Sequence, residues 1–161
     1  MAASPDSALH RLLVESPVGP LAIDERNGAI VALSFVSAAS RPGSSATPLL
    51  ARAERQLAEY FAARRRRFDL PLAPAGTPFQ ERVWRALLGI PYGESRSYGE
   101  LAAELSSAPR ALGQACGQNP ITILIPCHRV LGAHGSLGGY SGGRGLKTKR
   151  FLLALEGALL A

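Results

Sequence analysis

The sequence contains few of the residues that build cross-linked or metal-stabilised folds. It has two cysteines, Cys116 and Cys127, and three scattered histidines among 161 residues. Two thiols are too few for a disulfide framework, and scattered imidazoles rarely make a zinc site. We therefore expect no disulfide framework, no metal ion and no other cofactor.

Long apolar runs are also missing. No window reaches the ~18 to 20 consecutive apolar residues of a membrane-spanning helix, and the first residues lack the charged start and apolar centre of a signal peptide. These features predict a cytoplasmic protein with no membrane partner. Because 47% of the residues are hydrophobic and only 19% are charged, we expect a chain that folds around a substantial core rather than a disordered one.

Acidic residues are scarce in the last third of the chain, although the formal net charge of the whole chain is only +6. Residues 1–105 carry 12 basic and 11 acidic side chains, whereas residues 106–161 carry 6 basic side chains and a single acid, Glu156. A positive excess confined to one part of a chain is typical of proteins that contact an anionic partner.

The first half of the chain has the pattern of a small sheet followed by a helix. Residues 12–36 alternate apolar runs with turn signals, which predicts an antiparallel sheet. Thr47-Pro48 then caps and starts a helix with apolar residues on one face. Residues 64–76 have the Pro- and Gly-containing composition of a connector, so we place a domain boundary there, between residues 1–76 and 77–161.

The second half is richer in helix signals. Capping boxes begin helices at Thr77 and Ser97, and a third helix over residues 108–118 is expected to be capped by Ser106 or Ser107. The last two of these helices, joined by a tight turn, form a candidate helix-turn-helix. Most such pairs are plain packing units, but the basic excess in this part of the chain favours contact with DNA.

The end of the chain combines a strand, a loop and a helix. The run Ile121–Ile125 is rich in β-branched residues and predicts a short buried strand, which Pro126 ends. Residues 135–143 form a glycine-rich loop that lets backbone approach a ligand closely, and a terminal helix follows from about Leu146 to Glu156. These elements predict an α+β fold, with a small N-terminal α/β domain containing an antiparallel sheet and a mainly helical C-terminal domain.

Cys127 directly follows the predicted strand, where a side chain is presented at the start of a loop. A cysteine attacks as its thiolate, and the adjacent His128 and Arg129 favour that form. Neighbouring side chains in extended backbone face opposite sides, so His128 reaches the sulfur only if the chain turns or a water molecule bridges them. Glu156, the one acid in this basic region, is the candidate that orients the imidazole. The alternative is a buried, inert cysteine, which is our interpretation of Cys116.

The segments around Cys127 resemble one known family. Residues 125–130 (Ile-Pro-Cys-His-Arg-Val), with residues 117–120 before them and 139–143 after them, are similar to the active-site region of the O6-alkylguanine-DNA alkyltransferases. Residues 1–76 share only the general character of that family's variable first domain. The other matching segments are 77–84, 90–93, 97–102, 110–113 and 152–157.

The resemblance implies DNA repair. Attack by a thiolate on carbon gives a thioether, for which the chain shows no resolving group, so we expect a single, irreversible turnover, and we also expect a monomer. Cys127 would accept the alkyl group from oxygen-6 of guanine in double-stranded DNA, through a water-mediated relay from His128 and Glu156; whether O4-alkylthymine is also a substrate stays open. Asn119 would brace the active-site turn, and Tyr98 would donate a proton or a hydrogen bond to the guanine leaving group. The remaining implied residues are Tyr140 and Ser141, which would line the alkyl pocket, and Arg110, which would fill the space left by the flipped base.

Two other interpretations stay open. Non-catalytic damage-binding proteins share the DNA-binding half of this family but lack the acceptor cysteine, so the presence of Cys127 argues against that class. A cysteine hydrolase that uses Cys127 and His128 predicts turnover of small esters or amides without DNA, and it leaves the helix-turn-helix without a purpose. Within the resemblance, Cys116 is a candidate minor second site of alkylation or oxidation.

Overall fold

The computed structural model describes residues 7–37, 47–140 and 142–158 and has the α+β fold expected from the sequence. Ser141, one of the expected pocket residues, lies outside the described residues. No helix within the described ranges is long and apolar enough to cross a membrane. The elements in chain order are β1 (His10–Val14), β2 (Leu21–Arg26), β3 (Ala29–Phe35), α1 (Pro48–Phe61), α2 (Pro78–Leu88), β4 (Arg96–Ser97), α3 (Tyr98–Glu104), α4 (Pro109–Gly117), η1 (Cys127–Arg129), β5 (Val130–Leu131), η2 (Ala133–Gly135) and α5 (Leu146–Leu155).

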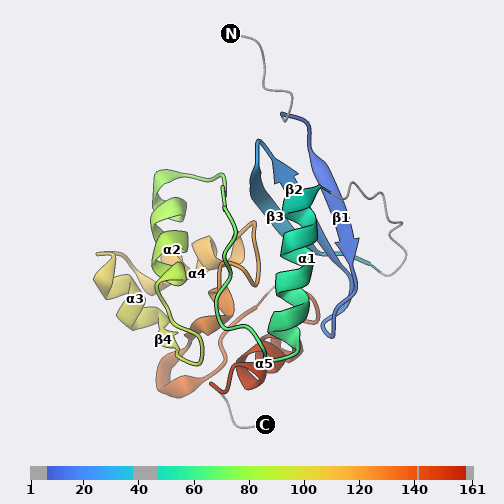
Figure 1. The fold of residues 1–161 in the computed structure, drawn as a ribbon. Helices are drawn as coiled ribbons and strands as arrows, with labels where there is room; N and C mark the ends of the chain where they lie inside the picture. Colours follow the sequence, from blue (N-terminus) through green and yellow to red (C-terminus); the bar gives the residue numbers. More distant parts are fainter. Residues whose placement is uncertain (1–6, 38–46, 141, 159–161) are drawn as a thin grey trace.

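Strands β1, β2 and β3 form the expected antiparallel sheet in that spatial order. Asn27 and Gly28 make the turn between β2 and β3 with φ angles of 53° and 76°, the left-handed geometry that an Asn-Gly pair favours. Helix α1 lies against this sheet (Figure 1), and Thr47 caps it by accepting a hydrogen bond from the Leu50 backbone N–H. Leu50 and Leu57 are buried, so the predicted helix and its apolar face are confirmed.

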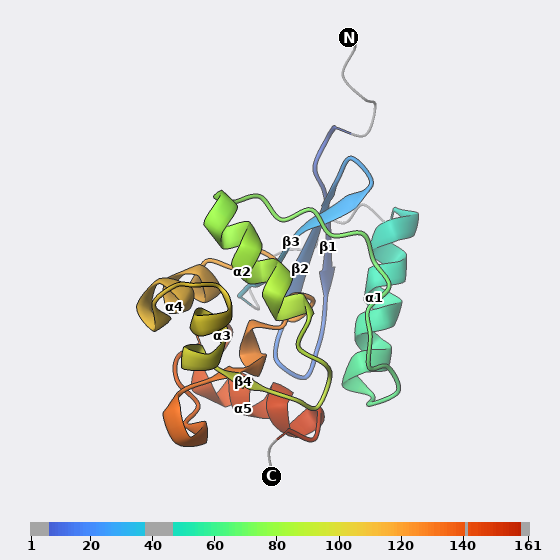
Figure 2. The same ribbon diagram turned by 90° about the vertical axis from the view of Figure 1, so that its left-hand side faces the viewer.

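Helices α2, α3 and α4 group together on the other side of the sheet from α1 (Figure 2). Thr77 and Gln80 form the predicted capping box at the start of α2, each side chain bonded to the backbone of the other residue. Helices α3 and α4 form the expected helix-turn-helix pair. The expected cap of α4 was wrong: neither Ser106 nor Ser107 caps it, and the helix begins at Pro109 without a side-chain bond. Proline suits the first turn because its φ is already helical and it has no N–H to satisfy.

The run Ile121–Ile125 is largely buried, as predicted, but it is not a strand. Ile123 has a φ of 71°, and the last N–H of the run donates to its first carbonyl (2.9 Å), so the segment folds into a tight turn. The apolar pattern indicated burial but hid the turn, because β-branched residues rarely adopt positive φ. Strand β3 holds this turn in place: the Leu33 N–H donates to the Pro120 carbonyl (3.0 Å), and the Leu33 carbonyl accepts from the Thr122 hydroxyl (2.9 Å).

This turn leads directly into η1, whose first residue is Cys127. Strands β4 and β5 pair in parallel beside the start of α3. Helix α5 packs against η1 and has Glu156 as its C-terminal cap residue. Buried apolar side chains from the sheet, from α1 to α5 and from the turn form one continuous cluster. Segments that lie far apart in the sequence are therefore fixed relative to one another around Cys127.

Candidate active site

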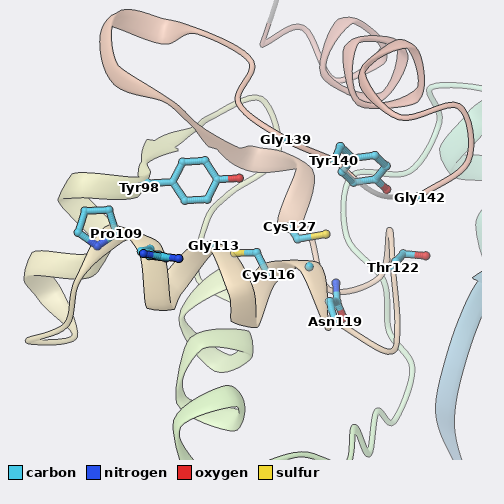
Figure 3. A pocket seen from close by; sticks show the side chains of 12 residues that line it. Tyr98, Pro109, Gly113, Cys116, Asn119, Thr122, Cys127, Gly139, Tyr140 and Gly142 are labelled. Atoms are coloured by element: carbon cyan, nitrogen blue, oxygen red, sulfur yellow. The ribbon is translucent and has the colours of Figure 1, made fainter.

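A cavity of about 580 Å³ opens beside Cys127 (Figure 3). Its wall contains five of the residues that the sequence indicated: Tyr98, Arg110, Asn119, Cys127 and Tyr140. Tyr98 and Tyr140 stand on either side of Cys127 in Figure 3. Cavities of this volume hold small organic ligands, so the space is large enough for one nucleobase.

Asn119 fixes the turn that presents Cys127. Its Nδ2 donates to the Ile125 carbonyl (2.8 Å), and its Oδ1 accepts from the Ile121 N–H (3.0 Å). The side chain is buried, so these bonds replace the water that the two backbone groups would otherwise need. This geometry suits the bracing role that the resemblance implies for Asn119.

Cys127 is a buried thiol, with 7% of its surface exposed. Burial raises the pKa of this thiol, while the nearby amide of Asn119 and the positive charge of Lys149 oppose the rise. The resting side chain is therefore neutral. The sequence suggested that Arg129 would favour the thiolate, but its guanidinium is bonded to Glu156, and the cation that acts on the sulfur is Lys149.

Lys149 is a fully buried lysine on α5. Its Nζ donates to the carbonyl oxygens of Val130 (2.6 Å) and Gly139 (3.2 Å) and lies 5.7 Å from the centre of the Tyr98 ring. Within the part of the chain that the structure describes, no carboxylate forms an ion pair with it. Burial lowers the pKa of Lys149, and the two pocket cysteines, when ionised, raise it. The pocket thiols, Cys127 and then Cys116, are thus the groups whose ionised form this buried cation would stabilise.

His128, which follows Cys127 in the chain, pairs with Glu156, and both side chains are fully buried. The Nε2 atom of His128 lies 2.8 Å from Glu156 Oε2, so Nε2 carries the proton when the ring is neutral. The Nδ1 atom is buried and has no hydrogen-bond partner among the described residues, which leaves its lone pair free to accept a proton. Burial lowers the pKa of His128, and the carboxylate of Glu156 opposes this. The imidazole of His128 is therefore neutral in the resting protein.

Glu156 is held by two further side chains. Arg129 donates from Nε to Oε1 (2.8 Å) and from Nη2 to Oε2 (3.0 Å), and the Tyr60 hydroxyl donates to Oε2 (2.6 Å). Burial alone would raise the pKa of this carboxyl, but the hydrogen bonds and charges of His128 and Arg129 outweigh burial and lower the pKa to about 2. Glu156 is consequently charged at every physiological pH.

The aromatic and basic residues of the pocket differ in their surroundings. Burial raises the pKa of Tyr98 to about 12, and the pocket cysteines add to the rise, so its hydroxyl keeps its proton at neutral pH.

The hydroxyl of Tyr140 is buried without a partner among the described residues. Arg110 lines the cavity and is exposed on α4. A Cβ at Gly138, where φ is 67°, would lie 3.0 Å from the Tyr98 ring, so the glycine-rich loop passes close to the cavity.

Cys116 lines the same cavity, from the buried face of α4. Burial and the nearby Cys127 raise the pKa of its thiol to about 12, so it is neutral at physiological pH. Its part as a second site of alkylation or oxidation stays a prediction. Across the described ranges, no three His, Cys, Asp or Glu side chains gather in a cluster that would hold a metal ion.

Two family models match most of the chain. Residues 9–74 match the "6-O-methylguanine DNA methyltransferase, ribonuclease-like domain", and residues 78–158 match the "6-O-methylguanine DNA methyltransferase, DNA binding domain". The chain belongs to the 6-O-methylguanine DNA methyltransferase family. The resemblance noted around Cys127 in the sequence is thereby confirmed.

Curated relatives of this methyltransferase match along nearly their whole length. The "Methylated-DNA--protein-cysteine methyltransferase" of Mycobacterium tuberculosis is 45% identical over 154 residues, which cover 92% of each chain. The constitutive protein of the same name from Bacillus subtilis is 45% identical over 152 residues, covering 88% of this chain and 92% of the relative. A crystal structure of Mycobacterium tuberculosis OGT in complex with DNA has a TM-score of 0.82 and 46% identity, covering 92% of this chain and 93% of that chain.

Two buried residues beside the candidate site, Lys149 and Tyr60, were not among the residues predicted from the sequence. The sequence does contain a pattern that indicates burial of Lys149, because it shares one helical face with Leu152, Leu153 and Glu156, all of which are buried. A lysine on the buried face of a helix is rarely there without a partner. No pattern in the sequence indicates a special role for Tyr60, because an aromatic residue on the apolar face of α1 is expected in any core.

Proposed function

We propose that this methyltransferase repairs double-stranded DNA by transferring the alkyl group of O6-alkylguanine to the sulfur of Cys127. The observation that carries the proposal is the setting of that sulfur, which lines a nucleobase-sized cavity, is influenced by the buried charge of Lys149 and neighbours the His128–Glu156 pair. A thiol becomes an effective nucleophile when a base and a cation are placed to form its thiolate. The similarity to a relative solved in complex with DNA supports DNA as the partner.

The reaction begins with loss of the Cys127 proton. Nδ1 of His128 accepts it, directly or through one bridging water molecule, and Glu156 stabilises the resulting imidazolium through Nε2. Lys149 stabilises the thiolate that remains. Because burial disfavours each isolated charge, the thiolate and imidazolium form together when substrate is present rather than in the resting protein.

The sulfur then attacks the alkyl carbon. A carbon–sulfur bond forms while the bond from the alkyl carbon to oxygen-6 breaks, and its electron pair stays with the guanine. Tyr98, which is a neutral phenol at physiological pH, donates a hydrogen bond or proton to the leaving guanine. If the phenol gives up its proton, the proton that His128 took from Cys127 restores it, so guanine gains the one proton that the thiol lost. The product is a thioether, which water does not reverse, so each protein molecule acts once.

Access to the base requires that it leave the duplex. The modified oxygen is enclosed within the base stack, and enzymes that act on such atoms rotate the nucleotide into a pocket. Helices α3 and α4 supply the helix-turn-helix, and the exposed Arg110 at the cavity is the residue proposed to fill the vacated space. The basic excess in residues 106–161 neutralises phosphates, so binding should weaken with salt and depend little on sequence.

We further propose that the protein acts as a cytoplasmic monomer without a metal or other cofactor, and that residues 1–76 and 77–161 are its two domains. Every reacting group named above comes from one chain, which supports a monomer.

Label transfer tests the proposed activity against its two rivals. A duplex oligonucleotide carrying tritiated O6-methylguanine should label the protein to one methyl group per molecule and then stop. Cys127→Ala should remove the labelling, whereas Cys116→Ala should retain it. A damage-binding protein would bind the duplex without taking up label, and a cysteine hydrolase would turn over p-nitrophenyl acetate repeatedly without DNA; either result would contradict the proposal.

A further inference from the structure

Tyr60 connects helix α1 to the carboxylate of the candidate relay. Its side chain is 1% exposed, and its hydroxyl donates to Glu156 Oε2 at 2.6 Å, between residues 96 positions apart in the sequence. None of the steps described above uses this hydroxyl. A buried phenol that bonds a charged carboxylate next to a base is placed to influence that base.

The hydrogen bonds at Glu156 show what Tyr60 adds. Oε2 accepts from three donors, namely Tyr60 (2.6 Å), His128 (2.8 Å) and Arg129 Nη2 (3.0 Å), whereas Oε1 accepts from Arg129 Nε (2.8 Å). Arg129 alone therefore holds both oxygens in place. Tyr60 instead acts on the charge of the one oxygen that also bonds His128.

We propose that Tyr60 is a positioning residue for alkyl transfer, whose hydroxyl draws charge from Glu156 Oε2 and so sets how readily His128 accepts the proton of Cys127. The inference rests on the proposed function. It means that the N-terminal part of the chain, which lines none of the cavity beside Cys127, takes part in the chemistry there through a single hydrogen bond.

The direction of the effect follows from the groups around His128. Burial and the charges of Arg129 and Lys149 lower the pKa of the imidazole, and Glu156 raises it. A carboxylate that gives up one donor carries more charge on its oxygen and stabilises the imidazolium more strongly. Removing the Tyr60 hydroxyl should therefore raise the pKa of His128.

Tyr60→Phe separates this effect from packing. The ring lies 5.2 Å from the Phe61 ring, 5.2 Å from the Phe68 ring and 6.3 Å from the Tyr92 ring, and phenylalanine keeps these contacts. Tyr92→Phe is the matched control, because the Tyr92 hydroxyl donates to the Leu155 backbone carbonyl (3.2 Å) rather than to a relay carboxylate.

The measurement is the rate of benzyl transfer from the free base O6-benzylguanine as a function of pH, which needs no DNA. The acid limb of this profile reports protonation of His128, because a protonated imidazole accepts no proton from the thiol. Tyr60→Phe should move the acid limb to higher pH by about half a unit or more, and Tyr92→Phe should leave it unchanged. Superimposable profiles for wild type and Tyr60→Phe would overturn the inference.

A second variant reverses the sign and does not depend on how well Tyr60→Phe folds. Placing 3,5-difluorotyrosine at position 60 keeps the ring and strengthens the O–H donor, so the acid limb should move to lower pH. A shift to higher pH, or no shift, would contradict the inference. Failure of the wild type to take up the benzyl group would instead count against the proposed function itself.

Discussion

His128 and Glu156 are bonded through Nε2 and Oε2 at 2.8 Å, and this pairing leaves Nδ1 of the same ring as the free acceptor. From the sequence, His128 could reach the Cys127 sulfur only if the chain turned there or a water molecule bridged them. The short helix η1, which begins at Cys127, supplies this turn. The orientation of one ring thus decides which nitrogen receives the proton.

Lys149→Met should slow alkyl transfer at neutral pH by about tenfold or more, since one unit in the pKa of a thiol changes its thiolate population tenfold. Loss of the buried positive charge removes one of the influences that lower the pKa of Cys127, so transfer should require higher pH. The rate of benzyl transfer measured across a pH series checks this. Lys147→Met is the control, because Lys147 is exposed on the same helix. Equal rates for wild type and Lys149→Met would contradict the assigned role.

The ion pair of Glu156 should make folding stability sensitive to acid. The pKa in the folded protein, about 2, lies below the ordinary value of 4.5, so the ionised carboxylate stabilises the fold fully above pH 4.5 and loses this contribution as the pH falls towards 2. The difference corresponds to about 3 kcal/mol.

Urea unfolding at pH values from 6 to 3 measures this contribution. Wild type should lose stability across the range, whereas Glu156→Gln should be less stable at pH 6, because Arg129 and His128 lose their charged partner, and should then decline less steeply. Glu104→Gln, at an exposed position on α3, serves as the control and should follow wild type. Parallel declines for wild type and Glu156→Gln would show that the pair does not couple stability to pH.

Arg110→Ala should lower transfer from duplex DNA about tenfold more than transfer from O6-benzylguanine, because only the duplex substrate requires a base to leave the stack. Arg150→Ala is the control for charge alone, since Arg150 is exposed on α5 and belongs to the same basic region. Single-turnover rates on the two substrates give the comparison. Equal losses on both would indicate a damaged pocket, and unimpaired duplex repair would refute the space-filling role.

The parts of the fold that could be predicted are those with strong local chemistry. The capping box at Thr77, the cap at Thr47 and the turn at Asn27-Gly28 each depend on neighbouring residues, and all are present. The predicted strand Ile121–Ile125 failed because its turn is imposed by distant partners: Asn119 bonds both of its ends, and β3 bonds the segment from the side.

The candidate site likewise contains residues that could be predicted from the sequence and residues that could not. Cys127, His128 and Glu156 could be proposed from residue type and from the resemblance, and the structure places His128 against Glu156. The burial of Lys149 could be predicted from its face of α5, but its position near Cys127 depends on how α5 packs against η1. The hydrogen bond of Tyr60 could not be predicted, because it joins residues 96 positions apart. No local pattern reports such distances.

The most direct test of alkyl transfer to Cys127 is the mass of the intact protein after incubation with a duplex containing O6-methylguanine, followed by peptide mapping. We predict a gain of one CH₂ unit per protein molecule, located on the peptide that contains Cys127, with no further gain when more substrate is added. An unchanged mass, or a methyl group found on Cys116 while Cys127 stays free, would contradict it.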